Sequence, residues 1–431
     1  MLAFLGLLTI ILLLLLVITK KASPVVALIM VPVATALMAG FTTELLGFIT
    51  DGIKSISVTA VMFVFAILFF GILMDAGTFD PIISRLLKLA GKDPARIALA
   101  TAILAMLVHL DGSGAVTFLI TVPAMLPLYD TLGMRRSTLA TIVALAAGTM
   151  NILPWGGPTI RAATALNVPV TELFNPLLIP IIIGLITVLV IAYILGVKER
   201  KYAKILAEAN IEPVTSAEAA PNMLTRPRLL WFNLFLIVLS VVTLIVGWAP
   251  PHIIFMIAFS IALTINYPKV KEQRDRIDAH AKSALLMASI LFAAGCFTGI
   301  LKGSGMIDAM ATATVKHIPS QVGNRLALIT GLLSMPASLV FDPDSFYFGI
   351  LPLLSTTATH FNGDAIDVGR AAIMGQMTTG FPVSPLTGAT FLLVGLTGVD
   401  LGDHQRKTIP LAFLVTLIIL LVSIIIGAIS I

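Results

Sequence analysis

Residues 109–132 read HLDGSGAVTFLITVPAMLPLYDTL, and residues 340–361 read VFDPDSFYFGILPLLSTTATHF. In both stretches an apolar run reaches an aspartate, passes through a short break, and resumes as an apolar segment that contains proline. The aspartates are Asp111 and Asp342. An ionised carboxylate within an apolar segment is costly in lipid, so it normally faces protein partners or water inside a helix bundle. Two such places in matching positions indicate a binding site.

The composition is that of a polytopic membrane protein. Of the 431 residues, 58% are hydrophobic and 11% are charged, whereas soluble proteins average about 45–50% apolar and about 25% charged residues. The net charge of +5 comes from Lys and Arg clusters in short loops between apolar runs. We therefore attribute it to membrane topology and expect no nucleic-acid partner. The single cysteine, Cys296, lies in an apolar stretch, so no disulfide framework or cysteine metal site is expected.

The apolar runs divide the chain into two similar halves, each all-α. A spanning helix needs about 20 apolar residues, and such runs include those near 56–76 and 283–302. We expect residues 1–200 to form a first repeat, with a re-entrant hairpin over about 97–132 and a broken transmembrane helix over about 137–167. Residues 228–431 form the second, with a hairpin over about 326–360 and a broken helix over about 364–397. The polar stretch 201–227 is expected to be a cytoplasmic linker.

The positive charges predict the orientation. Most Lys and Arg residues fall on one side of the expected spans, and the positive-inside rule makes that side cytoplasmic. Both termini are then extracellular, with the apolar N-terminal run kept as a first helix. The first hairpin enters from the cytoplasm and the second from outside, so the repeats are inverted. Inverted repeats with broken helices are typical of secondary transporters.

Polar side chains gather where the apolar helices break. Broken helices free backbone N–H groups and expose positive helix ends, which suit carboxylates. Arg161 could clamp a substrate carboxylate through two parallel hydrogen bonds. The candidate substrate-binding residues are Ser113, Thr149, Asn151, Gly157, Thr159, Arg161, Ser345, Thr378, Thr379, Ser384 and Thr387.

The acidic residues at the hairpin tips allow two kinds of chemistry. Asp111, Asp342 and Asp344 supply the hard oxygen ligands that Mg²⁺ or Ca²⁺ prefers. Asp111 and Asp342 could also carry a coupled proton, with His109 as a relay. The sequence does not decide between metal binding and proton coupling.

Structural alternatives exist for these residues. Asp342 to Asp344 could form an exposed turn, Arg161 could extend to the outer interface, and a neighbouring helix could satisfy a buried His109. Serine and threonine often bond back to their own helix. Acidic residues at span ends are expected to be solvated loop charges: Asp75, Asp364, Asp367, Asp400 and Asp403. A remote alternative function is an intramembrane aspartyl protease with Asp111 and Asp342 as its dyad.

Four sequence motifs around these residues give the chain a family resemblance. HLDGSGAVTFL, NILPWGGPTIRAA, FDPDSFYFGILP and GFPVSPLTGATFLLVGL resemble the citrate-metal complex:proton symporter family (CitMHS) of the ion transporter superfamily, and the likeness covers essentially the whole chain. The resemblance implies uptake of citrate complexed with a divalent metal of the Mg²⁺ or Ca²⁺ type by proton symport across a bacterial plasma membrane. It implies no tightly bound cofactor, and a homodimer with an elevator-type mechanism.

The hairpin tips depart from those of related carriers. Sodium-coupled dicarboxylate carriers have a serine-asparagine-threonine signature there, whereas this chain has Asp111 to Gly114 and Asp342 to Ser345. Acidic tips fit a metal-bearing substrate or protons at least as well as Na⁺. Other di- or tricarboxylates, Na⁺/H⁺ exchange and oxyanion efflux remain alternative functions within the superfamily.

Overall fold

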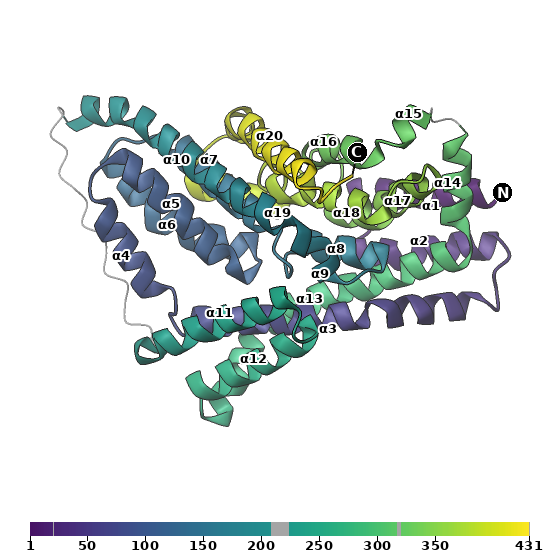
Figure 1. The fold of residues 1–431 in the computed structure, drawn as a ribbon. Helices are drawn as coiled ribbons and strands as arrows, with labels where there is room; N and C mark the ends of the chain where they lie inside the picture. The colour runs from purple at the N-terminus through teal and green to yellow at the C-terminus, as the bar shows by residue number, and fades with distance from the viewer. Residues whose placement is uncertain (20, 208–223, 317–319, 431) are drawn as a thin grey trace.

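The computed structural model describes residues 1–19, 21–207, 224–316 and 320–430, and helices are the regular secondary structure within these ranges (Figure 1). Short helical turns at His109–Asp111, Ser345–Ile350 and Gly375–Thr379 lie between the longer helices. The α-helices are α1 (Leu2–Ile18), α2 (Pro24–Met38), α3 (Leu45–Asp75), α4 (Asp80–Ala90), α5 (Pro94–Val108), α6 (Gly114–Thr131), α7 (Arg136–Met150), α8 (Gly157–Leu166), α9 (Val170–Phe174), α10 (Leu178–Ala207), α11 (Leu230–Val246), α12 (Pro251–Asn266), α13 (Val270–Gly303), α14 (Met306–Val315), α15 (Ser320–Gly323), α16 (Leu326–Ala337), α17 (Leu351–His360), α18 (Ala365–Ile373), α19 (Gly388–Thr397) and α20 (Leu401–Ile425).

Seven helical segments in the described part of the chain are long and apolar enough to cross a membrane, or eight if the bent pair that ends in α19 counts as one span. Large apolar side chains are exposed along several of them, for example Phe235 and Val242 on α11 and Ile186 on α10. Exposed apolar stripes of this kind are unfavourable in water. They fit helices whose outer faces meet lipid.

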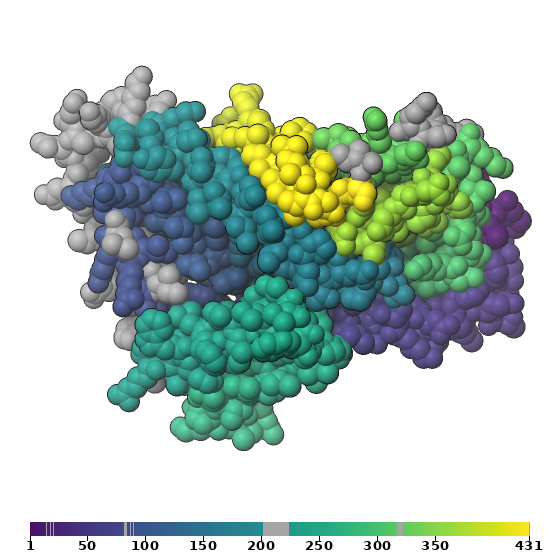
Figure 2. All heavy atoms as spheres, viewed as in Figure 1, coloured from purple at the N-terminus to yellow at the C-terminus, as the bar shows by residue number. Residues whose placement is uncertain are grey.

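The helices form two groups that face each other. α3 packs along α13 and α12, whereas α10 packs against α5, α7 and α20. In Figure 1 the first group lies below the second. Figure 2 shows the green α11 and α12 as a lobe that is separated by a hollow from the helices above it. The candidate site described below lies between the two groups.

Four helix interruptions lie in the second group. α5 and α6 meet at residues 109–113, and α16 and α17 are joined through residues 338–350. α7 and α8 are separated by residues 151–156, and the pair formed by Ala365–Val383 and Gly388–Thr397 is bent by 43°. These interruptions contain most of the polar residues named from the sequence.

Two helices begin earlier than the apolar runs predict. α3 begins at Leu45 instead of near 56, and α13 begins at Val270 instead of near 283. Hydropathy detects the part of a helix that suits lipid, but polar residues such as those of 270–282 can continue the same helix beyond it. Of the expected linker, residues 201–207 extend α10 and residues 208–223 lie outside the described residues.

Glycines allow α3 and α13 to pack closely. A Cβ atom at Gly299 would lie 2.7 Å from the Cα of Gly52, and one at Gly295 would lie 2.7 Å from Ile56. Small residues four positions apart let the backbones of membrane helices approach each other. The crossing of α3 and α13 therefore has no room for even one extra methyl group.

We predict that Gly299→Ala destabilises the protein, because its methyl group would force α3 and α13 apart. Overpacking costs about 1–3 kcal/mol, so thermal unfolding of the purified variant should begin at a lower temperature. Gly47→Ala is the matched control, since no atom lies within 4 Å of a Cβ at that helical position. Equal unfolding temperatures for the two variants would contradict the close packing.

Candidate substrate site

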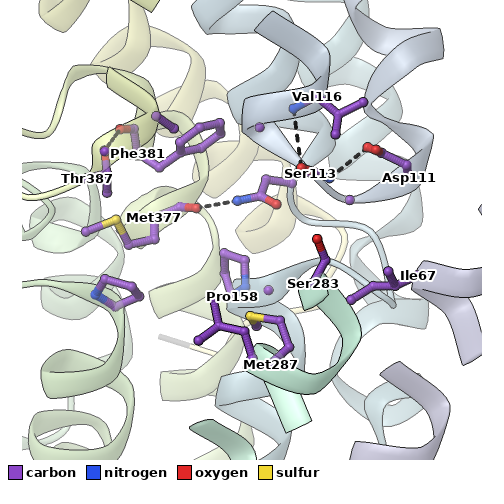
Figure 3. Close-up of a pocket in the computed structure, with 18 of the residues that line it drawn as sticks. Ile67, Asp111, Ser113, Val116, Pro158, Ser283, Met287, Met377, Phe381 and Thr387 are labelled. Atoms are coloured by element: carbon purple, nitrogen blue, oxygen red, sulfur yellow. Dashed lines mark hydrogen bonds between the residues drawn. The ribbon is translucent and has the colours of Figure 1, made fainter. Parts of the chain in front are cut away.

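A cavity of about 840 Å³ lies where the two hairpin tips, the two helix breaks and the helices α3 and α13 meet. Figure 3 looks into it, with Met377, Phe381 and Thr387 across from Asp111 and Ser113. The tips and breaks supply most of its polar groups, and α3 and α13 supply apolar side chains such as Ile67 and Met287. Ligand sites commonly combine an apolar wall with a few convergent polar groups.

The first hairpin tip is shaped by a tight turn. Gly112 has φ of +74°, a conformation that glycine adopts without strain. The backbone N–H of Ser113 donates to Oδ1 of Asp111 at 2.7 Å, and the Ser113 hydroxyl accepts from the N–H of Val116 at 3.3 Å. The turn thereby directs the N-terminus of α6 at the cavity, since Gly112, Ser113 and Gly114 all line it. This helix end can attract an anion.

The second tip is organised by Asp342. Its Oδ1 accepts from the backbone N–H groups of Asp344 and Ser345, both at 3.1 Å. Its Oδ2 is buried and has no hydrogen-bond partner among the described residues. Asp342 and Asp344 both line the cavity, which leaves a carboxylate oxygen of the tip unsatisfied there.

A buried ion pair joins the two halves of the chain at this cavity. Nε of Arg161, on α8, donates to Oδ1 of Asp344 at 2.7 Å, and the two side chains are only 9% and 6% exposed. A Cβ at Gly157 would lie 2.8 Å from Nη1 of Arg161, so a larger residue at that position would displace the guanidinium. Removing one partner of such a pair leaves a buried charge without compensation.

The helix breaks are also tied to each other. Nδ2 of Asn151, in the first break, donates to the carbonyl of Met377, in the second, at 2.7 Å. Met377 has φ of +53°, and its N–H donates to the hydroxyl of Ser338. A non-glycine residue in this conformation costs free energy unless its surroundings hold it. Asn151 and Ser338 hold the second break open at the cavity.

The chain matches the family described as "Citrate transporter" (CitMHS) over residues 13–380. It belongs to this citrate transporter family. A "Citrate transporter" of Bacillus subtilis is 45% identical over 430 residues and covers 100% of both chains. A "Mg(2+)/citrate complex secondary transporter" of the same organism is 42% identical over 437 residues, again across 100% of both. The family is one of transporters, not enzymes.

A solved structure supports the fold of this chain. The Alcanivorax borkumensis YdaH transporter superposes with a TM-score of 0.62 at 15% identity, over 90% of this chain and 87% of that one. The prediction of an all-α membrane protein with the ion transporter superfamily fold is therefore confirmed. The expected multi-pass bacterial membrane protein is also supported by the family and by the apolar helices.

The structure brings part of the predicted site to the cavity. The predicted residues that line it are Asp111, Ser113, Asn151, Gly157, Arg161, Asp342, Asp344 and Thr387. The others lie behind the wall: His109, Thr149, Thr159, Ser345, Thr378, Thr379 and Ser384. Most of the predicted residues that line the cavity therefore come from the tips and from the first break with the start of α8.

Several of the residues behind the wall have structural partners. The hydroxyl of Thr159 donates to the carbonyl of Ile152, and that of Thr379 bonds to Thr416. The hydroxyl of Ser384 donates to the carbonyl of Ser338. These bonds stabilise the breaks. The buried hydroxyls of Thr149, Ser345 and Thr378 have no hydrogen-bond partner among the described residues.

His109 is fully buried behind the first tip. Its Nδ1 bonds to the hydroxyl of Thr117 at 2.8 Å, and its Nε2 lies 3.4 Å from Oδ1 of Asn151. It reaches the cavity only through Asn151, which lines the wall. Both ring nitrogens of His109 therefore have side-chain partners, which agrees with the alternative of a buried histidine satisfied by its neighbours.

The three tip aspartates share a cavity but do not form one coordination sphere. In the described ranges no three Asp, Glu, His or Cys side chains gather closely enough to hold a metal ion. Asp344 is engaged with Arg161, and Asp342 with its own tip. A metal ion at this site would therefore need oxygen ligands from another source, such as its own chelator.

The sequence interpretation missed a charged group on the opposite wall. Asp75 was expected to be a solvated loop charge, but it lines the cavity and is paired with Arg276 and His280. Asp367 also differs from that expectation, since it is 4% exposed and paired with Arg370. The partners of Asp75 come from α13, a contact that the sequence does not show. Asp367 is paired within α18 and also accepts from the N–H of Ser430, which lies 63 positions away.

Proposed function

We propose that the protein imports citrate as a complex with a divalent metal ion, coupled to proton symport. The observation that carries the proposal is the Arg161–Asp344 ion pair, because it presents a cation and a carboxylate side by side at the cavity. A metal–citrate complex likewise presents a carboxylate and a cation together. The relative whose name states Mg²⁺/citrate transport supports the same substrate class.

In this proposal the substrate exchanges partners with the ion pair. A carboxylate of citrate takes the place of Asp344 on Arg161, while Asp344 becomes a ligand of the metal. Citrate alone would leave the buried Asp344 unpaired, and metal alone would leave Arg161 unpaired. Either of these states leaves one buried charge uncompensated, which costs about 3–5 kcal/mol. The site therefore favours the complex over each of its components.

The total charge favours the complex as well. Carboxylic acids ionise near pH 4, so free citrate carries about three negative charges at neutral pH and its complex with a divalent cation about one. Among the described residues, four aspartates and one arginine line the cavity. Like charges in a partly desolvated site repel by several kcal/mol. The trianion is rejected, whereas the complex brings its own compensating charge.

The remaining groups take supporting tasks. The N-terminus of α6, with Ser113, receives a second carboxylate of citrate, as helix ends do for anions. Asn151, Gly157 and Thr387 complete the polar wall. Asp111 and the free oxygen of Asp342 are further ligands for a hard ion such as Mg²⁺ or Ca²⁺. Asp111 and Asp342 also remain candidates to carry the coupled proton, with His109 as a relay.

We also propose the orientation and assembly implied by the sequence. The two halves are inverted repeats, both termini face outward, and residues 201–227 link the halves on the cytoplasmic side. The distribution of Lys and Arg supports this topology. A homodimer with an elevator-type motion is the assembly that the family resemblance implies.

Uptake of labelled citrate into proteoliposomes tests the function. We expect uptake to require a divalent cation and to increase with an inward proton gradient. A panel of Mg²⁺, Ca²⁺, Mn²⁺, Ni²⁺, Zn²⁺ and Fe³⁺ would identify the preferred complex. Citrate uptake that is indifferent to both metal and proton gradient would defeat the proposal, and transport of inorganic ions without citrate would favour the exchanger alternative.

A further inference from the structure

A compact charged group lies on the cavity wall opposite the hairpin tips. Oδ2 of Asp75, at the end of α3, accepts from Nη1 of Arg276 at 3.0 Å and from Nε2 of His280 at 2.9 Å. Arg276 and His280 are four residues apart on α13, so they lie on one face of that helix. Asp75 and His280 line the same cavity as the tips and are 22% and 23% exposed.

The imidazole is held in a defined position. A Cβ at Gly71 would lie 2.6 Å from Nδ1 of His280, so the ring rests on the bare backbone of α3 one turn before Asp75. The bond to Asp75 places the proton of the neutral ring on Nε2. Nδ1 is then the atom that can take up a second proton, and no hydrogen bond to it is found in the described part of the chain. A carboxylate that orients an imidazole in this way fixes which nitrogen titrates.

The charges around His280 allow its protonated ring to attract an anionic substrate. Asp75 and Arg276 compensate each other, so protonation of His280 adds one positive charge to the cavity wall. Across the cavity lie Arg161 with Asp344, and the tip carboxylates Asp111 and Asp342. Among the described side chains of α1 and α2, Val17 and Pro24 line the cavity, and neither carries a charge.

Charged residues near the start of α13 form ion pairs as well, since Glu272 lies 3.6 Å from Arg226 and 3.8 Å from Lys269. Arg226 pairs with Glu272 of α13 and lies 4.8 Å above the ring of Tyr267. His280 is the side chain of this wall that can gain a positive charge by taking up a proton at Nδ1.

We propose that His280, oriented by Asp75, binds the proton that is coupled to uptake. The inference rests on the proposed symport of a metal–citrate complex. That complex carries about one negative charge, as derived above from carboxyl ionisation, and protonated His280 supplies one positive charge to the same cavity. Nδ1 takes a proton from water as the complex binds and returns it to water as the complex leaves. By linkage, a proton that strengthens binding of the complex is itself bound more tightly in its presence.

The sign of the pH effect follows from this linkage. Affinity for the complex is highest when His280 is protonated, so it should fall as pH rises. Couplings of this kind amount to about 5–150-fold. In His280→Gln, affinity should change little between about pH 6 and 8, because the amide does not titrate.

Two transport assays separate proton coupling from binding. In exchange mode, labelled metal–citrate outside enters against unlabelled complex inside at equal pH, and no net proton movement is needed. In accumulation mode, an inward proton gradient drives uptake. We expect His280→Gln to keep measurable exchange but to lose gradient-driven accumulation, and Asp75→Asn to lose part of it. His360→Gln, at the exposed end of α17, is the control and should accumulate like the wild type.

A second variant leaves the histidine in place. The methyl group of Gly71→Ala would displace the imidazole from its site beside Asp75. It should reproduce the loss of accumulation, and it keeps the inference testable if His280→Gln does not fold. Accumulation by both variants at the wild-type level would overturn the inference and assign the proton to the tip carboxylates. A wild-type protein whose accumulation ignores the proton gradient would instead remove the proposed symport itself, and this inference with it.

Discussion

Arg161→Ala should abolish citrate uptake. The change removes the only arginine that lines the cavity in the described part of the chain and leaves Asp344 buried without its partner. Truncating one partner of a buried charge pair at a binding site costs about 2–5 kcal/mol of binding free energy, which corresponds to a loss of affinity of at least about 30-fold. The measurement is initial uptake of labelled metal–citrate into proteoliposomes, together with the unfolding temperature of the purified variant.

Two further variants test whether this loss is specific to the guanidinium of Arg161. Arg161→Lys keeps the charge but loses the planar fork that binds a carboxylate with two hydrogen bonds, so it should recover only part of the uptake. Arg96→Ala is the control, because the side chain of Arg96 is 70% exposed and lies at the opposite end of α5 from the first hairpin tip. Wild-type uptake by Arg161→Ala would remove Arg161 from the site.

Asp344→Asn should make citrate binding independent of metal. The amide cannot neutralise Arg161, so the guanidinium is left free to accept a carboxylate from citrate that carries no metal. At the same time the metal loses a ligand, and affinity for the complex should fall by about 10–100-fold, as expected for loss of one charged contact. Metal-free citrate should therefore stabilise the variant but not the wild type.

Thermal unfolding with added citrate measures this difference between the variant and the wild type. The buffer is stripped of divalent ions with a solid chelating resin, because soluble chelators are themselves polycarboxylates. Metal-free citrate should raise the unfolding temperature of Asp344→Asn but not that of the wild type, since a ligand stabilises only the protein that binds it. Asp51→Asn, at a side chain that is 80% exposed, should behave as the wild type does. An Asp344→Asn variant that still needs metal would refute the partner exchange.

The fold could be predicted because lipid limits the choices. Apolar runs of spanning length, interrupted by Gly112 or by Pro343, leave few arrangements in which the backbone stays hydrogen-bonded. The helix ends were less predictable. α13 begins at Val270 with polar residues, whereas hydropathy detects only the apolar part of this helix. Composition determines which segments suit the membrane, but not where a helix stops outside it.

The site could be predicted only in part, for a related reason. Asp111, Arg161 and Asp342 interrupt apolar sequence, and the cost of an isolated charge there identifies them individually. Their pairing does not follow from that cost, because Arg161 and Asp344 lie 183 positions apart. Asp75 and His280 escaped notice because each lies near the polar end of a helix. Only the crossing of α3 and α13 brings them into the cavity wall.

Simultaneous counting of citrate and metal tests the central claim most directly. Proteoliposomes would be supplied with carbon-labelled citrate and a radioactive form of the divalent cation that best supports uptake, and both labels counted in the same vesicles. The account predicts that the two accumulate in a one-to-one ratio, and that neither accumulates when the other is withheld. Citrate entry without the metal label would contradict it.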